Sequence, residues 1–290
     1  MKRKITGYFK KLFRILKKPE MAILPSNIAF NIILAIIPIL TITALIASSF
    51  DISIDMVEKL ITTIMPNEVS QIIIDVISGK GFDETVGISN LIAFILASNG
   101  AYAIIIASDT LYKTNNKDAI KKRVNSLVII TIIIMLLLFL VVVPVFGENI
   151  INLLHKAEIL ESYIDEIRVV FNIFKWPLTV LIIYFNIKLI YTIAPSKKIK
   201  SKETTYGAMF TTVMWLVATE IFKFYLQYFA RYDILYGNLS SIIILLVWCY
   251  VLSYIFVLGL AINASNKEEE ELFENTKKLA LTELQNKIKK

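Results

Sequence analysis

The chain has 290 residues, 56% of them hydrophobic, and its mean hydropathy is +0.66. Apolar runs of about 18 residues or more recur along it, which excludes a soluble domain and predicts an all-α, polytopic membrane protein. The lone cysteine, Cys249, lies in one of these runs, which excludes disulfides and cysteine-based metal sites. The formal net charge of +7 could indicate a nucleic-acid partner, so its distribution along the chain has to be considered.

The N-terminal segment, residues 1–21, is basic and amphipathic. Residues 4–18 place apolar side chains on one helical face and lysines and arginines on the other. This pattern predicts an interfacial helix that lies in the membrane surface against anionic lipid; an ordinary soluble amphipathic helix is the alternative. No short apolar core with a small-residue cleavage site follows, so no secretory signal peptide is expected.

Six transmembrane helices are predicted next, each longer than the roughly 20 residues that cross about 30 Å of hydrocarbon. They cover residues 22–48, 86–110, 124–146, 173–194, 205–229 and 238–264. Together they form a membrane domain, residues 22–264, and a charged tail, residues 265–290, follows it. Apolar stripes in residues 52–78 and 160–171 predict further helices in the extracytoplasmic loops.

Basic residues set the expected orientation. Twenty-three of the 31 lysines and arginines lie in the segments that would face inward with a cytoplasmic N-terminus, and five lie in the segments that would face outward. This asymmetry predicts a cytoplasmic-membrane protein with both termini in the cytoplasm. It also accounts for the net positive charge as a topology signal and a lipid contact, without a nucleic-acid partner.

The fifth predicted span carries two opposite charges. Glu220 and Lys223 are three residues apart and therefore share a helix face, which Gln227 continues one turn later. A lone charge near the bilayer centre costs about 2.5–3.5 kcal/mol, so the stripe is expected to point into the helix bundle. Two interpretations stay open: a structural ion pair that fixes helix packing, or part of a water-filled or head-group-binding path.

Amides in the first two spans are candidates for the same path. Asn31 lies one turn after Asn27, and Asn99 lies in the middle of the second span. Trp248 lies deep in the sixth span, where its indole N–H should need a partner. The candidate intramembrane polar path comprises Glu220, Lys223, Gln227, Asn31, Asn27 and Asn99.

Enzyme motifs are nearly absent from the sequence. The single histidine is His155, and there is no HExxH, cysteine pair or glycine-rich phosphate loop. No catalytic residue, metal or cofactor is therefore assigned, and ribonuclease activity is not expected.

Several short stretches carry a family resemblance: "NIAFNIILAIIPIL", "ASNGAYAIIIASDTLY", "LIYTIAP", "EIFKFYLQYF" and "LYGNLSSIIILLVWCYVLSYIFVLGLAINA". With them the sequence resembles the YihY / virulence factor BrkB family of inner-membrane proteins, some members of which have carried a "ribonuclease BN" label. The resemblance implies six spans in the cytoplasmic membrane. Matching motif positions are Pro38, Ser98, Gly100, Tyr191, Pro195, Tyr236, Gly237, Trp248 and Gly259. A departure follows Gly259, where the family commonly has Ala-Glu and this chain has Leu260 and Ala261.

Two functions from different classes fit these observations. The first is a transporter, flippase-like or channel-like protein for a lipid or small solute, which would use the polar path. The second is a membrane scaffold or partner-docking protein of the cell envelope, without transport activity. Membrane lipids are the expected partners, and an envelope protein or a second copy of the chain remains an alternative partner.

Overall fold

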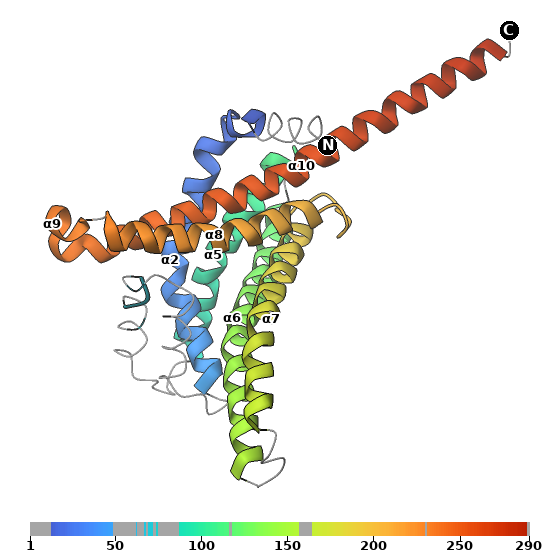
Figure 1. The fold of residues 1–290 in the computed structure, drawn as a ribbon. Helices are drawn as coiled ribbons and strands as arrows, with labels where there is room; N and C mark the ends of the chain where they lie inside the picture. Colours follow the sequence, from blue (N-terminus) through green and yellow to red (C-terminus); the bar gives the residue numbers. More distant parts are fainter. Residues whose placement is uncertain are drawn as a thin grey trace.

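A computed structural model describes residues 13–48, 87–115, 118–156, 164–229 and 231–288, with isolated positions between 62 and 74. Over these residues the chain is helical, without β-strands. The long helices are α2 (Glu20–Ser48), α5 (Gly87–Leu111), α6 (Ala119–Lys156), α7 (Ile164–Ile193), α8 (Thr205–Tyr228) and α10 (Ser240–Ile288). A short helix, α9 (Tyr232–Tyr236), and a 3-10 turn, Gly237–Leu239, join α8 to α10 (Figure 1). The predicted all-α fold class is confirmed.

Five of these helices are long and apolar enough to cross a membrane. The stretches concerned are Phe94–Leu111, Ala119–Phe139, Glu166–Ile193, Thr205–Tyr228 and Ser240–Glu270. In α2 the described apolar stretch is shorter, Glu20–Ile36. The whole of α2 has 29 residues, about 43 Å at the rise of an α-helix. Six spans were expected, and the described residues contain five that meet the criteria of length and hydropathy.

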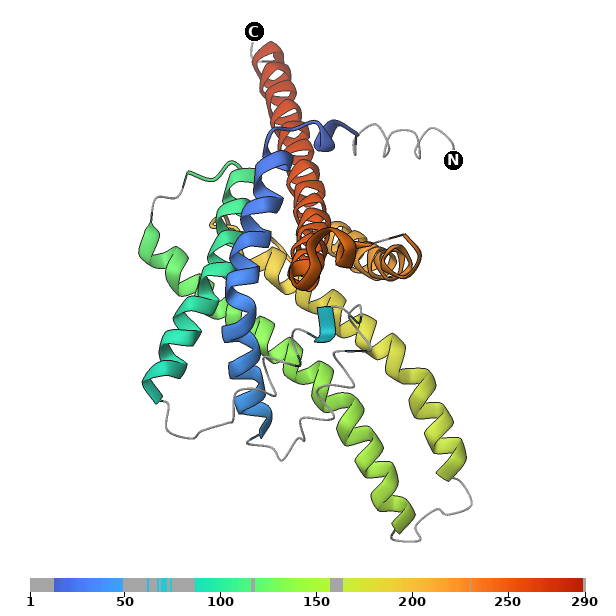
Figure 2. The same cartoon turned by 90° about the vertical axis from the view of Figure 1, so that its left-hand side faces the viewer.

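The helices fall into two groups that cross each other. In Figure 1, α2, α5, α6 and α7 run side by side, and the hairpin of α8 and α10 lies across them. Helix α10 packs against both α2 and α8, while α5 packs against α2 and α6. The view in Figure 2 agrees, with α10 next to α2 and α8 on the far side of α10. Helix α8 therefore has one face on α10 and another face turned away from the bundle.

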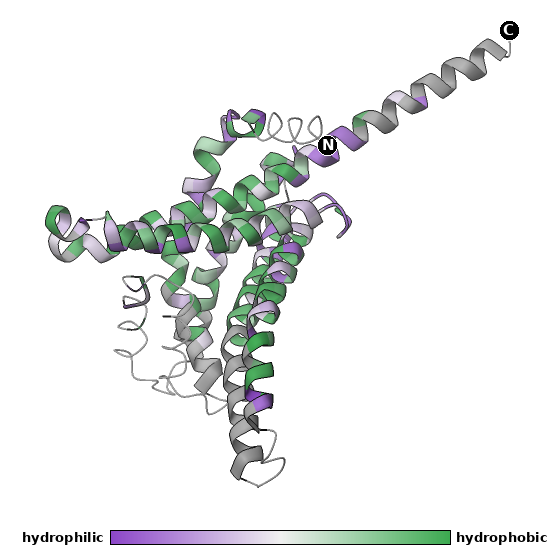
Figure 3. Cartoon of the chain, viewed as in Figure 1, coloured by the Kyte–Doolittle hydropathy of each residue, from purple (hydrophilic) through white to green (hydrophobic). Residues whose placement is uncertain are grey.

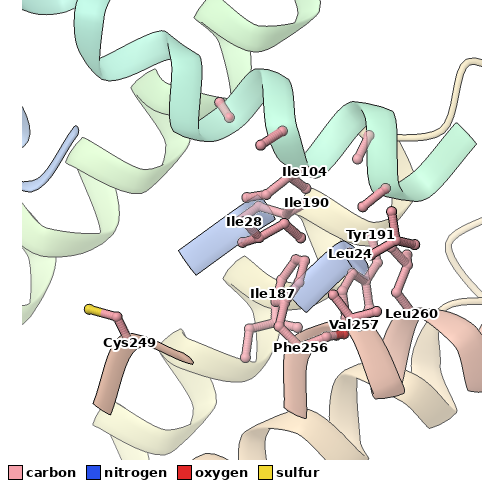
Figure 4. Close-up of a cluster of buried hydrophobic side chains, with 14 of the residues drawn as sticks. Leu24, Ile28, Ile104, Ile187, Ile190, Tyr191, Cys249, Phe256, Val257 and Leu260 are labelled. Carbon is pink, nitrogen blue, oxygen red and sulfur yellow. The ribbon is translucent and has the colours of Figure 1, made fainter. Parts of the chain in front are cut away.

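The core lies where the two groups cross (Figure 4). Leu24 and Ile28 of α2, Ile187 of α7 and Val257 and Leu260 of α10 are all buried there. Small residues let helices approach closely, which is how packing holds helices together inside a membrane. A Cβ added at Gly100 of α5 would lie 3.4 Å from the Cβ of Ala35 on α2.

Outward-facing side chains of the apolar helices are mostly apolar too. Helices α7 and α8 bury only a small share of their spans, and large hydrophobic side chains stand exposed along both. In Figure 3 the green, hydrophobic colour accordingly covers the sides of these helices. An exposed apolar surface of this extent suits the hydrocarbon of a bilayer and not water.

The predicted span limits agree with the helices to within a few residues at most ends, but three helices run on past them. Helix α6 begins at Ala119 and ends at Lys156, where the prediction gave residues 124–146. Helix α7 begins at Ile164, so the described part of the stripe expected over residues 160–171 forms its first turns and not a separate loop helix. Helix α10 continues without a break through the expected boundary at residues 264–265, and its second half leaves the bundle (Figure 1). Two predicted segments lie outside the described residues. They are residues 1–12 and, except for isolated positions, the helices expected over residues 52–78.

Candidate functional site

The ion pair predicted in the fifth span forms on α8. Lys223 Nζ lies 3.0 Å from Glu220 Oε1, and the two side chains are 32% and 73% exposed. Helix α8 packs through Phe222 and Leu226, and Glu220 lies about 200° around the helix from Phe222. The expectation that this stripe points into the bundle is therefore wrong, because the opposite face of α8 makes the helix contacts.

Aromatic side chains flank the ion pair on the same outward face. Gln227 is exposed one turn beyond Lys223, and Phe224 and Tyr228 are exposed with ring centroids 4.7 Å apart. We call Glu220, Lys223, Phe224, Gln227 and Tyr228 the α8 polar stripe. It occupies the half of α8 that leads to α9, and Glu220 lies about 12 Å along the axis from the last residue of the helix.

The predicted amides are engaged elsewhere. Asn31 Nδ2 donates to the carbonyl oxygen of Asn27 at 2.9 Å and to its Oδ1 at 2.8 Å, within α2. Asn99 Oδ1 accepts from Arg123 Nη1 at 2.9 Å, which links α5 to α6. These hydrogen bonds do not reach α8, so the described contacts do not join the three amides to the α8 polar stripe.

A second charged group, which the sequence analysis did not single out, is buried at the end of α5. Asp109 Oδ2 lies 2.7 Å from Lys122 Nζ of α6, with side-chain exposures of only 6% and 12%. Asp109 also accepts hydrogen bonds of 2.8 Å from Thr114 Oγ1, from Ser196 N and from Ser196 Oγ. We call Asp109, Thr114, Lys122 and Ser196 the α5-end cluster. It ties together α5, α6 and the segment after α7.

Local backbone geometry places Asp109 in this cluster. Helix α5 ends with Lys113 in the left-handed region, at φ 53°. Thr114 N donates to Asp109 O at 2.9 Å and Lys113 N donates to Thr110 O at 3.2 Å. These are the two hydrogen bonds of a Schellman motif, which reverses the chain at a helix C-terminus. The reversal brings Thr114 back beside the carboxylate of Asp109.

Family-motif residues hold the α8–α10 hairpin together. Tyr191 OH donates to Phe256 O at 2.6 Å and lies 2.7 Å from Thr211 Oγ1, with all three groups buried. Asn263 Oδ1 accepts from Gly207 N at 2.7 Å. A Cβ at Gly207 would overlap the carbonyl of Gly259, so only glycine permits this approach of α8 and α10.

Three other family-motif residues, Pro195, Gly237 and Trp248, are either buried or located in a turn. Pro195 is buried just after α7, and Gly237 adopts φ +52° in the turn after Tyr236. Trp248 is buried, and its Nε1 has no hydrogen-bond partner among the described residues. The predicted need for a partner at this indole therefore stays a prediction.

Two ion pairs hold α10 where it leaves the bundle. Lys267 Nζ lies 2.8 Å from Glu203 Oε1, and Lys113 Nζ lies 2.7 Å from Glu268 Oε1.

Burial raises the pKa of Tyr112 above its ordinary value, and the negative charge of Glu203 raises it further. The hydroxyl of Tyr112 therefore stays neutral and can donate a hydrogen bond. Over the described residues, no three His, Cys, Asp or Glu side chains gather in a way that could hold a metal ion.

Fold and surface together define a multi-pass, all-α membrane protein. The chain belongs to the Virulence factor BrkB family, whose model matches residues 13–281. This confirms the family predicted from the sequence.

The names of the curated relatives differ: one calls its protein ribonuclease-like, and the others call theirs membrane proteins. YfkH of Bacillus subtilis (strain 168), whose name calls it ribonuclease-like, is 26% identical over 92% of this chain and 97% of its own. A UPF0761 membrane protein of Vibrio campbellii is 28% identical over 42% of this chain and 43% of its own. One of Coxiella burnetii is 31% identical over 38% of this chain and 43% of its own. No solved structure matches the chain.

Proposed function

We propose that this protein handles lipids inside the membrane as a flippase-like transporter, with the α8 polar stripe guiding a phospholipid head group. One observation carries the proposal: Glu220, paired with a partly buried Lys223, is exposed on the outward face of an apolar, membrane-length helix. The stripe faces the surroundings of the protein, and in a membrane those surroundings are lipid.

The energetic cost of this arrangement supports a polar partner for the stripe. A charge surrounded by hydrocarbon costs about 2.5–3.5 kcal/mol on insertion scales, and pairing within one helix offsets only part of it. Polar groups that could reach Glu220 from the lipid phase belong to phospholipid head groups and to the water that accompanies them. A stripe that lowers the cost of bringing a head group below the interface lowers the barrier to lipid movement between leaflets.

Burial of the other polar groups favours a lipid over a solute that passes through the bundle. Asp109 and Lys122 neutralise each other in the α5-end cluster, and Tyr191 and Asn263 bond across the α7, α8 and α10 contacts. These groups hold helices together, so they do not line a continuous internal path. The α8 polar stripe differs from these groups, because Glu220 is exposed on the surface of a membrane-length helix and can still bind a ligand.

Lipid movement in reconstituted vesicles tests the proposal. Vesicles of phosphatidylcholine with traces of acyl-chain NBD-labelled lipid would be treated with dithionite, which quenches only the outer leaflet. We expect the protein to accelerate quenching of the protected half, Glu220→Ala to slow it, and Val213→Ala to leave it unchanged, since Val213 is an exposed apolar residue of α8. Quenching equal to that of protein-free vesicles, or equal for Glu220→Ala and the unaltered protein, would contradict the proposal.

A scaffold role is the second candidate, because α10 extends beyond the bundle to Ile288 as a charged helix (Figure 1). It predicts that deleting residues 271–290 abolishes the cellular phenotype and the recovery of a partner, while Glu220→Gln leaves both intact. The lipid proposal predicts the reverse: Glu220→Gln impairs the cellular phenotype, and deletion of residues 271–290 leaves it intact. The two variants therefore separate the functions in a single genetic experiment.

A further inference from the structure

The geometry points to a zwitterionic phospholipid, one whose head group carries both a phosphate and an ammonium, as the preferred ligand of the α8 polar stripe. This inference rests on the proposed function and names the lipid class that the stripe selects. It follows from the charge, the unused hydrogen-bonding capacity and the aromatic neighbours of the pair.

Opposite charges on the stripe match opposite charges on the ligand. Glu220 and Lys223 are the only charged residues of α8, so the helix surface presents a local dipole with no net charge. A zwitterionic head group lying antiparallel to that dipole brings its ammonium to the carboxylate and its phosphate to the lysine. A purely anionic head group gains the lysine but meets the carboxylate 3.0 Å away from it.

Both members of the pair keep capacity for a ligand. Lys223 Nζ has three donors and places one on Glu220 Oε1, at 3.0 Å. The other oxygen of Glu220 has no partner among the described residues, and its side chain is 73% exposed. One zwitterion can therefore bond to each residue without breaking the pair.

Aromatic rings beside the carboxylate favour an ammonium at that end. Phe224 lies one turn after Glu220, Tyr228 lies one turn after Phe224, and both rings are exposed. Ammonium and quaternary ammonium groups bind over aromatic faces, more strongly where water is scarce. The opposite side of the stripe offers the ammonium of Lys223 and the amide of Gln227, which donate hydrogen bonds to phosphate oxygens.

Head-group selectivity tests the inference directly. Acyl-labelled phosphatidylethanolamine and phosphatidylglycerol would be compared as traces in the same phosphatidylcholine vesicles, so that only the head group differs. We expect the unaltered protein to move the zwitterionic lipid about fivefold faster, a modest ratio because exposed ion pairs are weak. Glu220→Gln should raise the relative rate of phosphatidylglycerol, Lys223→Gln should lower it, and the swapped pair E220K/K223E should restore the original order.

Several results would overturn the inference, and they are distinct from failure of the proposed function. A preference for phosphatidylglycerol, or one ratio shared by all four proteins, would refute zwitterion selection while leaving lipid movement intact. Loss of all movement in both E220K and K223E, with recovery when the two are co-reconstituted, would instead assign the stripe to contact with a second copy of the chain. Absence of any lipid movement that depends on Glu220 would remove the proposed function itself. Thermal unfolding of each purified variant shows that it is folded before its rates are compared.

Discussion

The α5-end cluster allows one stability prediction to be worked out atom by atom. In Asp109→Asn the side chain keeps its shape but loses its charge. Its oxygen can still accept from Thr114 and from Ser196 N, both of which bond to Oδ1. Its amide nitrogen then replaces Oδ2, where it faces Ser196 Oγ and the ammonium of Lys122.

The size of the stability loss in Asp109→Asn follows from the charge of Lys122, which the substitution leaves unpaired. Removing one partner of a buried ion pair costs about 3–5 kcal/mol, because the other charge stays buried. The side chain of Lys122 is 12% exposed and can reach some water, so we expect the lower end, about 3 kcal/mol. Glu268→Gln is the matched control, since it breaks the exposed pair with Lys113 and should cost less than about 1 kcal/mol.

Unfolding of the purified protein in mild detergent, titrated with SDS and followed by tryptophan fluorescence, measures both values. Lys122→Met added to Asp109→Asn removes the orphaned charge and should recover about 2 kcal/mol, as replacement of a whole buried pair often does. Equal losses for Asp109→Asn and Glu268→Gln would refute the reasoning. So would a double variant less stable than either single one.

Three further predictions concern packing, backbone and topology. Gly259→Ala should lower the free energy of unfolding by about 3 kcal/mol, the upper end for overpacking, because its Cβ would overlap Thr211 Oγ1. Gly100→Ala should be near neutral, because the nearest contact of its Cβ is at 3.4 Å. Equal shifts of the thermal unfolding temperature for the two variants would contradict the packing argument. Gly237→Ala should cost about 1–2 kcal/mol although its Cβ meets nothing within 4 Å, because φ is +52°, and Gly237→Asn should cost less. In a Cys249→Ser background, a cysteine replacing exposed Lys121 should react with an impermeant maleimide only after the cells are opened, because basic segments are expected in the cytoplasm. Labelling of this cysteine in intact cells would place the segment outside the cytoplasm and contradict the predicted orientation.

Helix positions were predictable because hydrocarbon thickness leaves long apolar runs few alternatives. The limits of α8 and the start of α2 lie within two residues of the predictions. Composition could not place the end of α10, because a charged helix leaving a membrane carries no apolar run. It could not place the start of α7 either, because an apolar stripe at a helix start looks like a separate amphipathic helix.

The two charged groups were harder to interpret from the sequence, for opposite reasons. Glu220 stands out because apolar residues surround it, yet the cost of burying a charge does not say which face of α8 meets α10. Asp109 does not stand out, because an acid at the end of a span looks like an ordinary boundary residue. Its partners, Lys122 and Ser196, are 13 and 87 positions away in the chain, and only tertiary packing brings them together.

Family membership and activity also depend on different residues in this chain. The motif residues Tyr191 and Gly259 lie inside the contact between α7, α8 and α10, where they fix the angle of the hairpin. Ala261, at the position where the family commonly has an acid, is buried in the same region. The α8 polar stripe, by contrast, lies on the outward face, where a substitution costs little packing and changes what the surface presents. Relatives can therefore share the fold through the buried motif and still differ in the lipid or partner they meet, so the function of this chain has to be tested at Glu220 and Lys223 and not inferred from a relative's name.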